Sequence, residues 1–210
     1  MVLGLPGVGV LDEQEARERV LAAAGHLFYA RGIQAVGMDD IRAESGVPLK
    51  RIYRSFPSKD HLVMAYLTRR DEQWTRALAA RVDQCREPRE RVLAAFSFLA
   101  EWFTQPGFRG CAFINAAGEL GGVSGGVTAI ARNHKRELRR YLAGLAADAG
   151  AADPSGLAAQ LLLLVDGAIV AAATEAAAEP AARAREAARC LLGPAAPGGP
   201  VAPGRADPAG

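Results

Sequence analysis

The sequence predicts an all-α fold, and three observations support this prediction. Apolar residues recur at helical spacing along most of the 210 residues. Glycine and proline interrupt that pattern at intervals typical of helix lengths, and no alternation of period two persists long enough to predict a strand. The composition is 50% hydrophobic, so the chain can bury a substantial core rather than remain disordered.

Local signals place nine helices along the chain. Each begins near a residue that caps a helix or suits its first turn, and each ends near a glycine, a proline or a polar break. The predicted helices span 12–31, 38–45, 48–55, 58–86, 88–104, 111–119, 128–149, 154–178 and 180–192.

The first three helices are the best defined. Gly32 ends the first, since glycine readily adopts the left-handed conformation that follows a helix. Asp39 and Asp40 lie in the first turn of the second, where the helix dipole favours anions. Gly46 provides a tight turn, and Pro48 suits the start of the third helix.

Similar signals define the rest. Ser58 can cap a long fourth helix, Pro88 opens the fifth, and Gln-Pro-Gly at 105–107 ends it. After a short sixth helix, the glycine-rich segment 121–126 predicts a flexible break before a seventh helix that is basic on one face. Asp153 with the proline after it caps an apolar eighth helix, and another proline opens the ninth.

Several functional classes are not indicated. The three cysteines form no CxxC pair, so neither a zinc site nor a disulfide framework is predicted, and no cofactor is expected. No nucleophile elbow, Walker loop, HExxH or paired-carboxylate motif points to an enzyme. Residues 1–11 lack the basic start of a signal peptide, so the cytoplasm is the expected location.

Two further segments need an interpretation. Residues 157–178 have the length of a membrane span, but the segment is rich in alanine and carries Asp166 near its centre. A buried helix or a subunit interface is the better interpretation, with no membrane partner. Residues 194–210 are mostly Pro, Gly and Ala and are expected to form a disordered tail.

The segment "SGVPLKRIYRSFPSKD" at 45–60 concentrates positive charge in a chain whose net charge is only +2. Two short helices joined by a glycine-containing turn predict a helix-turn-helix, whose second helix can enter the major groove of DNA. Its cations could then displace counterions from phosphates instead of neutralising acids of their own molecule. The alternative is a solvated basic face on an ordinary helical bundle.

The same region resembles a known family. Residues 13–61, with "VLAAAGHLFYARGIQAV", "MDDIRAESGV" and "IYRSFPSKDHL" in that order, are similar to the N-terminal domain of the TetR family of bacterial one-component transcriptional regulators. Beyond that region the similarity is weaker, although "PGFRGCAFINAAGEL" resembles a segment of some of these regulators.

The resemblance implies an all-helical homodimer on double-stranded operator DNA. Residues 12–57 would form the three-helix DNA-binding domain and 58–193 a larger domain for ligand binding and dimerisation. It also implies which residues meet DNA: the start of the recognition helix, its phosphate-facing part and the start of the fourth helix. These are Leu49, Lys50, Arg51, Tyr53, Arg54 and Lys59.

Two positions depart from the family pattern. Gly37 and Pro48 stand where such regulators usually carry hydroxyl residues that cap a helix and bind phosphate. Both positions remain in the predicted DNA-binding set, but we expect Arg51, Arg54 and Lys59 to anchor more of the phosphate contact here.

The larger domain carries candidates for a small-molecule effector site, which typically combines an apolar lining with a few polar groups. The candidates are Trp102, Phe103, Phe108, Phe113, Asn115, His134 and Asp166. The alternative for the aromatic residues is plain core, and His134 lies in a basic run that favours the surface. Asp166 needs a partner, for which Arg109, Arg132, a cationic ligand or a basic group across a dimer could serve.

The sequence therefore predicts a ligand-responsive DNA-binding transcriptional regulator, acting as a repressor that a small molecule releases from its operator. The two C-terminal helices are the expected dimer interface, because alanine-rich faces allow close approach. The alternative is a DNA-binding module without a small-molecule effector, either constitutive or controlled by a protein partner.

Overall fold

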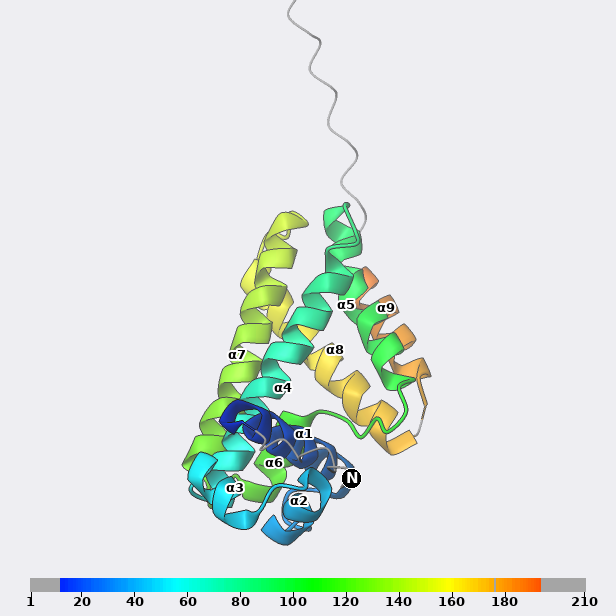
Figure 1. Cartoon of the computed structure of the whole chain (residues 1–210). Coiled ribbons are helices and arrows are strands. Elements are labelled where there is room, and N and C mark those ends of the chain that lie inside the picture. Colours follow the sequence, from blue (N-terminus) through cyan, green and yellow to red (C-terminus); the bar gives the residue numbers. More distant parts are fainter. Residues whose placement is uncertain (1–11, 176, 194–210) are drawn as a thin grey trace, which may run out of the picture.

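The computed structural model describes residues 12–175 and 177–193, and in these ranges the chain forms nine helices and no strand (Figure 1). The helices are α1 Glu13–Arg31, α2 Met38–Ser45, α3 Leu49–Ser55, α4 Lys59–Val82, α5 Pro88–Phe103, α6 Ala112–Leu120, α7 Gly125–Asp148, α8 Pro154–Glu175 and α9 Glu179–Leu191. The predicted all-α class is confirmed. The tail predicted at 194–210 lies outside the described residues.

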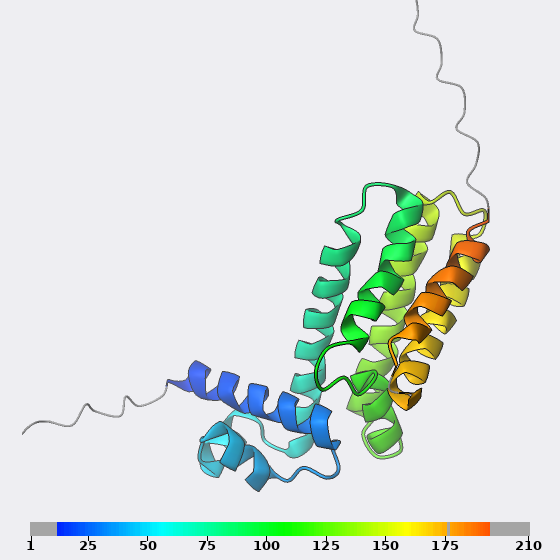
Figure 2. The ribbon, with the colours of Figure 1, turned by 90° about the vertical axis from the view of Figure 1, so that its right-hand side faces the viewer.

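The first three helices form a small bundle below the long helices of the body. Figure 2 shows α1 (dark blue) extending sideways from the lower end of the body, with α2 and α3 beneath it. Ile41, Ile52 and Phe56 are almost completely buried between these helices. Gly46 has the left-handed conformation (φ 68°) that closes α2 and turns the chain into α3, as its glycine predicts.

The fourth helix joins the two parts. It packs against α1 in the N-terminal bundle and against α5 and α7 in the body. One hydrophobic core runs through both parts and includes Val20, Leu67 and Phe96. The domain boundary between residues 57 and 58 therefore remains a prediction, because the hydrophobic core is continuous across it.

Three predicted helix boundaries are wrong. The fourth helix ends at Val82 and not near residue 86. The eighth ends at Glu175, three residues short of the prediction. The seventh begins at Gly125, because the Ser124 hydroxyl accepts a hydrogen bond from the Val127 N–H at 3.2 Å and caps the helix. Much of the expected flexible break is thus its first turn.

The apolar helix α8 is long and apolar enough, by length and composition alone, to cross a membrane. In the structure it is a bundle helix that packs against α7 and α9, with Leu161 and Val165 buried in the core. Its outer face leaves two large apolar side chains exposed, Leu163 at 74% and Val170 at 49%.

Candidate DNA-binding face and effector cleft

The helix α3 presents a polar face to solvent because its one buried apolar position, Ile52, faces the bundle. Lys50, Tyr53 and Arg54 are exposed, whereas Leu49 is half-buried against the core. Lys50 makes no ion pair or hydrogen bond with any other described residue. An exposed cation beside an exposed tyrosine is a combination that suits phosphate contact.

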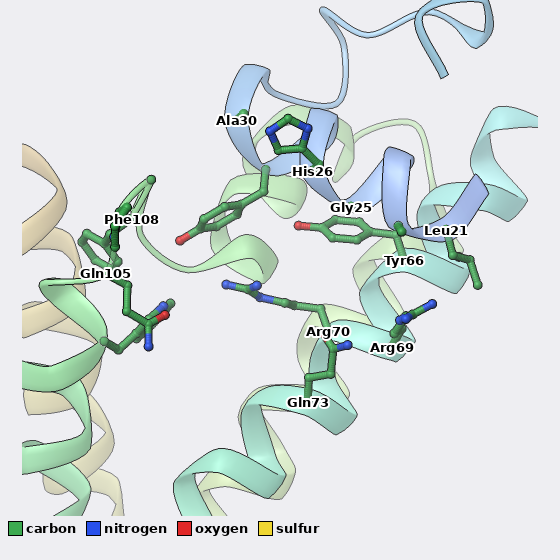
Figure 3. Close-up of a pocket in the computed structure, with 15 residues that line it drawn as sticks. Leu21, Gly25, His26, Ala30, Tyr66, Arg69, Arg70, Gln73, Gln105 and Phe108 are labelled. Carbon is green, nitrogen blue, oxygen red and sulfur yellow. The ribbon is translucent and has the colours of Figure 1, made fainter. Parts of the chain in front are cut away.

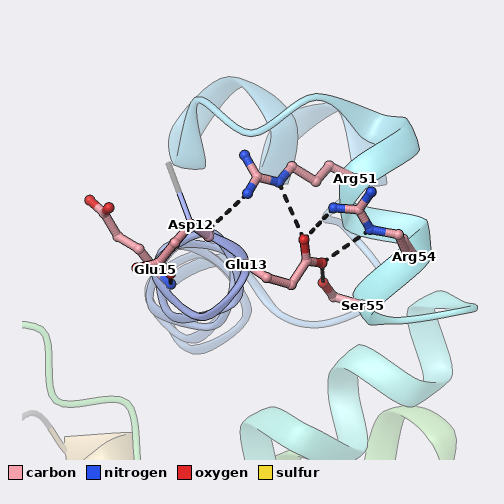
Figure 4. A network of polar contacts seen from close by, with 6 residues as sticks. All are labelled: Asp12, Glu13, Glu15, Arg51, Arg54 and Ser55. Atoms are coloured by element: carbon pink, nitrogen blue, oxygen red, sulfur yellow. Dashed lines mark hydrogen bonds and ion pairs between the residues drawn. The ribbon is translucent and has the colours of Figure 1, made fainter. Parts of the chain in front are cut away.

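Two of the cations already have an acidic neighbour. Arg54 forms an ion pair with Glu13 at the start of α1, and the Ser55 hydroxyl donates to the same carboxylate at 3.3 Å (Figure 4). Arg51 is largely buried and donates to the Asp12 carbonyl oxygen at 2.8 Å. The interpretation that these cations are free of acids in their own molecule is therefore wrong for Arg51 and Arg54.

The carboxylate of Glu13 is held in its charged form by this network. Its pKa is lowered, first by the hydrogen bond from Arg54 and then by the charges of Arg54 and Arg51. Glu13 and Arg54 lie 41 positions apart in the sequence, so no local pattern could have predicted their contact.

The remaining predicted DNA contacts lie around the start of α2 and α4. Gly37 and Pro48 are exposed and occupy the N-cap positions of their helices without a side-chain hydrogen bond to the helix backbone. The Gly37 N–H donates to the Asp40 carboxylate at 2.7 Å, so this donor is already used. Lys59 is partly buried; burial lowers its pKa, while the charges of Glu119 and Asp40 raise it.

An open cleft of about 650 Å³ lies where α1 meets the body. Its walls come from α1, α4, the end of α5 and the segment that follows α5 (Figure 3). Of the predicted ligand residues, Trp102 and Phe108 line it, and their rings meet edge to face at 5.1 Å. Phe103 packs against both rings without lining the cleft.

Two other predicted ligand residues lie behind this cleft. His134 is buried, only 3% exposed, so its expected place on the surface is wrong. Its ring stacks on Phe113 at 3.8 Å and its Nδ1 lies 2.6 Å from an Asp71 carboxylate oxygen. Burial lowers the pKa of His134, and the hydrogen bond to Asp71 only partly offsets this effect. The ring is therefore neutral at pH 7, with Nδ1–H as donor.

The last two candidates lie away from the cleft. Asp166 pairs with Lys135 on α7, which is neither of the two arginines that the sequence suggested as possible partners. Asn115 uses its amide to donate to the Arg109 carbonyl oxygen at 2.9 Å, which stabilises the start of α6.

Sequence reasoning missed the polar residues of the cleft. Tyr66 has the helical spacing of a core residue of α4, and Arg70 lies in a mixed run of charges without a pattern. The side chains of Gln73 and Gln105 also line the cleft. Only their convergence from α4 and from the segment that follows α5 distinguishes them from ordinary surface residues.

Two contacts connect the N-terminal bundle to the body at this junction. The Tyr29 hydroxyl on α1 donates to the Gly110 carbonyl oxygen at 2.9 Å and accepts from the Arg109 N–H at 3.0 Å. Glu119 on α6 accepts from both the backbone and the side chain of Gln34, at 2.8 and 2.6 Å. These hydrogen bonds tie α6 and the segment before it to α1 and to the loop that follows α1.

Comparisons with known proteins agree with this architecture. Residues 20–66 match the family model "Bacterial regulatory proteins, tetR family", and residues 88–188 match "Tetracyclin repressor-like, C-terminal domain". The crystal structure of SCO4454, a TetR-family transcriptional regulator from Streptomyces coelicolor, shares 31% identity with a TM-score of 0.80. That alignment covers 85% of this chain and 95% of SCO4454. The chain belongs to the TetR family.

Two curated relatives are similar over a shorter span. The HTH-type transcriptional regulator Rv1255c of Mycobacterium tuberculosis is 31% identical over 99 residues, or 42% of this chain and 49% of that protein. The transcriptional activator FasR of Mycolicibacterium smegmatis is 34% identical over 93 residues, or 42% of each. The matches thus span about half or less of these relatives. As a member of the TetR family, the chain is a DNA-binding transcriptional regulator, in a family of regulators rather than enzymes.

Proposed function

We propose that this TetR-family protein is a cytoplasmic, homodimeric repressor whose operator affinity falls when a small molecule binds. The observation that carries the proposal is the position of the cleft, because α1 forms one wall of it and also holds the recognition helix through Glu13. A molecule in the cleft would contact the DNA-binding part directly. No cofactor is needed for this function.

On the DNA side, Lys50 and Tyr53 are the exposed contacts on α3, with Arg54 joining when it leaves Glu13. Leu49, Pro48 and Gly37 would approach the duplex through backbone and apolar surface. Arg51 is assigned to hold α3 on α1, and Lys59 to a phosphate at the start of α4. The DNA-binding domain would comprise 12–57 and the effector and dimerisation domain 58–193.

The dimer is assigned to α8 and α9. These helices pack against each other and leave Leu163 and Val170 exposed on α8. A two-fold axis would pair this face with itself and cover both side chains. The two recognition helices would then stand about 34–36 Å or somewhat more apart, one turn of DNA.

Fluorescence anisotropy on a labelled duplex from the promoter of this protein's own gene tests the proposal. Affinity should fall steeply with salt, and Lys50→Ala should weaken binding and reduce the salt slope by about 0.9 per protomer. Arg76→Ala removes an equal charge from the exposed face of α4 and serves as the control. Equal behaviour of the two variants would contradict the assigned DNA face.

A promoter–reporter assay tests the direction of control. Deletion of the regulator should raise expression from its promoter if it represses, and lower expression would identify an activator. DNA binding that no small molecule changes would instead support a module without an effector.

A further inference from the structure

The junction cleft holds a cation that is not paired with an acid. Arg70 reaches from α4 into the cleft (Figure 3), and its guanidinium carbon lies 4.6 Å from the centre of the Tyr29 ring. It makes no ion pair or hydrogen bond with another described residue. The neighbouring Arg69 differs, because it pairs with Glu18 on α1. A half-buried guanidinium with only an aromatic face beside it retains unused donors.

The lining as a whole favours an anion. Among the described residues, no Asp or Glu lines this cleft, whereas Arg69 and Arg70 do. A much smaller cavity of about 10 Å³ lies on the far side of Arg70, and it is likewise lined by no acid. Its charged neighbour Lys135 is neutralised by Asp166. Neither cavity lining therefore supplies an acid that pairs with Arg70.

Neutral donors surround the same point. Tyr66 is buried and lines the cleft, and its hydroxyl makes no hydrogen bond with a described residue. Burial raises the pKa of Tyr66 to about 12, so the hydroxyl stays protonated and can donate. The amides of Gln73 and Gln105 line the cleft on either side. This arrangement can satisfy the oxygens of a carboxylate while Arg70 binds it in bidentate geometry.

An aromatic wall adjoins the polar group. Trp102 and Phe108 meet edge to face at 5.1 Å, and both line the cleft. Apolar area of this kind binds a flat ring through dispersion and through loss of hydrating water. The cleft volume of about 650 Å³ lies within the range of small-molecule sites.

We propose that the junction cleft binds a flat, hydrophobic carboxylate, with its anionic group on Arg70 and Tyr66 and its ring against Trp102 and Phe108. The assignment of this molecule as the effector rests on the proposed function above. Binding itself does not, because it depends only on the cleft.

The test uses isothermal titration calorimetry of the full chain without DNA, and three probes of nearly equal shape. These are biphenyl-4-carboxylate, the neutral biphenyl-4-carboxamide and the cationic 4-phenylbenzylammonium. The carboxylate should bind at least about tenfold more tightly than the amide, since hydrogen bonds to a charged group exceed neutral ones. The ammonium compound should bind most weakly.

Variants then locate the anion. Arg70→Gln should reduce carboxylate affinity by about tenfold or more and leave amide affinity within about twofold. Arg70→Lys should retain part of the preference, because it keeps the charge but loses the planar fork. Tyr66→Phe should reduce the affinity for the carboxylate probe by a smaller factor than Arg70→Gln does. Arg76→Gln changes the net charge equally, outside the cleft, and should have no effect. Circular dichroism confirms that each variant is folded.

Three results would overturn the proposal: no binding of any probe up to about 1 mM, equal affinity for carboxylate and amide, or a preference that Arg70→Gln leaves unchanged. The proposed function can be contradicted independently of the proposed binding site. If the carboxylate binds through Arg70 and promoter affinity measured by anisotropy is unchanged, the site stands and its role as effector site does not. If no promoter duplex binds at all, the DNA function fails while the calorimetry still decides the site.

Discussion

The pair between Glu13 and Arg54 predicts that the protein limits its own affinity for DNA. In the free protein Arg54 is held by Glu13, so Arg54 must leave this carboxylate before it binds a phosphate. Glu13→Gln removes the competing charge but keeps a side chain of similar size. We expect this variant to bind operator DNA more tightly.

The magnitude follows from the exposure of the pair. Both side chains are more than half exposed, and exposed ion pairs change equilibrium constants by factors of about 1.4 to 5. A dimer breaks two such pairs, so the gain should be about 2- to 25-fold. Removing the acid that competes with the phosphates for Arg54 should also steepen the dependence of log K on log salt, by up to about 0.9 per protomer.

Fluorescence anisotropy over a range of salt concentrations measures both quantities, and Glu15→Gln is the matched control. Glu15 lies in the same turn of α1 and pairs with Arg19 at 2.9 Å, away from α3. Glu15→Gln removes the same charge as Glu13→Gln, so long-range electrostatic effects should be alike in the two variants. If Glu13→Gln and Glu15→Gln show the same affinity and the same slope, Arg54 does not exchange Glu13 for a phosphate.

Three other predictions concern stability and assembly. Because the pKa of His134 is lowered in the fold, the imidazole binds a proton more readily in the unfolded chain than in the folded one. The free energy of unfolding should therefore be unaffected by this residue above pH about 6.5 and should fall as the pH drops below that value. His134→Gln should flatten this part of a plot of melting temperature against pH. Leu163→Glu should place a charge in the α8 interface and give monomers by light scattering, whereas Arg76→Glu, at an exposed salt bridge on α4 outside that interface, should leave the dimer intact. Phe56→Ala should destabilise the N-terminal bundle by about 3–5 kcal/mol in denaturant melts and abolish DNA binding while the dimer persists.

Much of the fold could be predicted because helix ends depend on local chemistry. Gly32, Gly46 and Pro88 end or begin helices for reasons contained in a few neighbouring residues, and the structure agrees with each. The prediction of a flexible break at 121–126 was wrong for an equally local reason. Its glycines suggested flexibility, but the Ser124 hydroxyl caps α7 and brings Gly125 into the helix.

The candidate sites were less predictable because their contacts join residues distant in the sequence. Asp166 pairs with a lysine 31 positions earlier, and His134 pairs with Asp71, 63 positions earlier. The basic run around His134 suggested solvent, but its helix turns that one residue towards Phe113. Arg70 had no sequence signal at all, since an unpaired cation is defined by the absence of acids around it in space.

One helix connects these observations. The N-terminus of α1 holds α3 through Glu13, its middle forms a wall of the cleft through Gly25, and its last turn is tied to the body by Tyr29. Arg70 lies over the ring of Tyr29, so an anion that draws the guanidinium towards itself also removes a contact from this tie. Because α1 is a continuous helix of 19 residues, a shift at Tyr29 would displace Glu13 and, with it, the cations of the recognition helix. Under the proposed function, effector chemistry and DNA contact would thereby be coupled through a single rigid element.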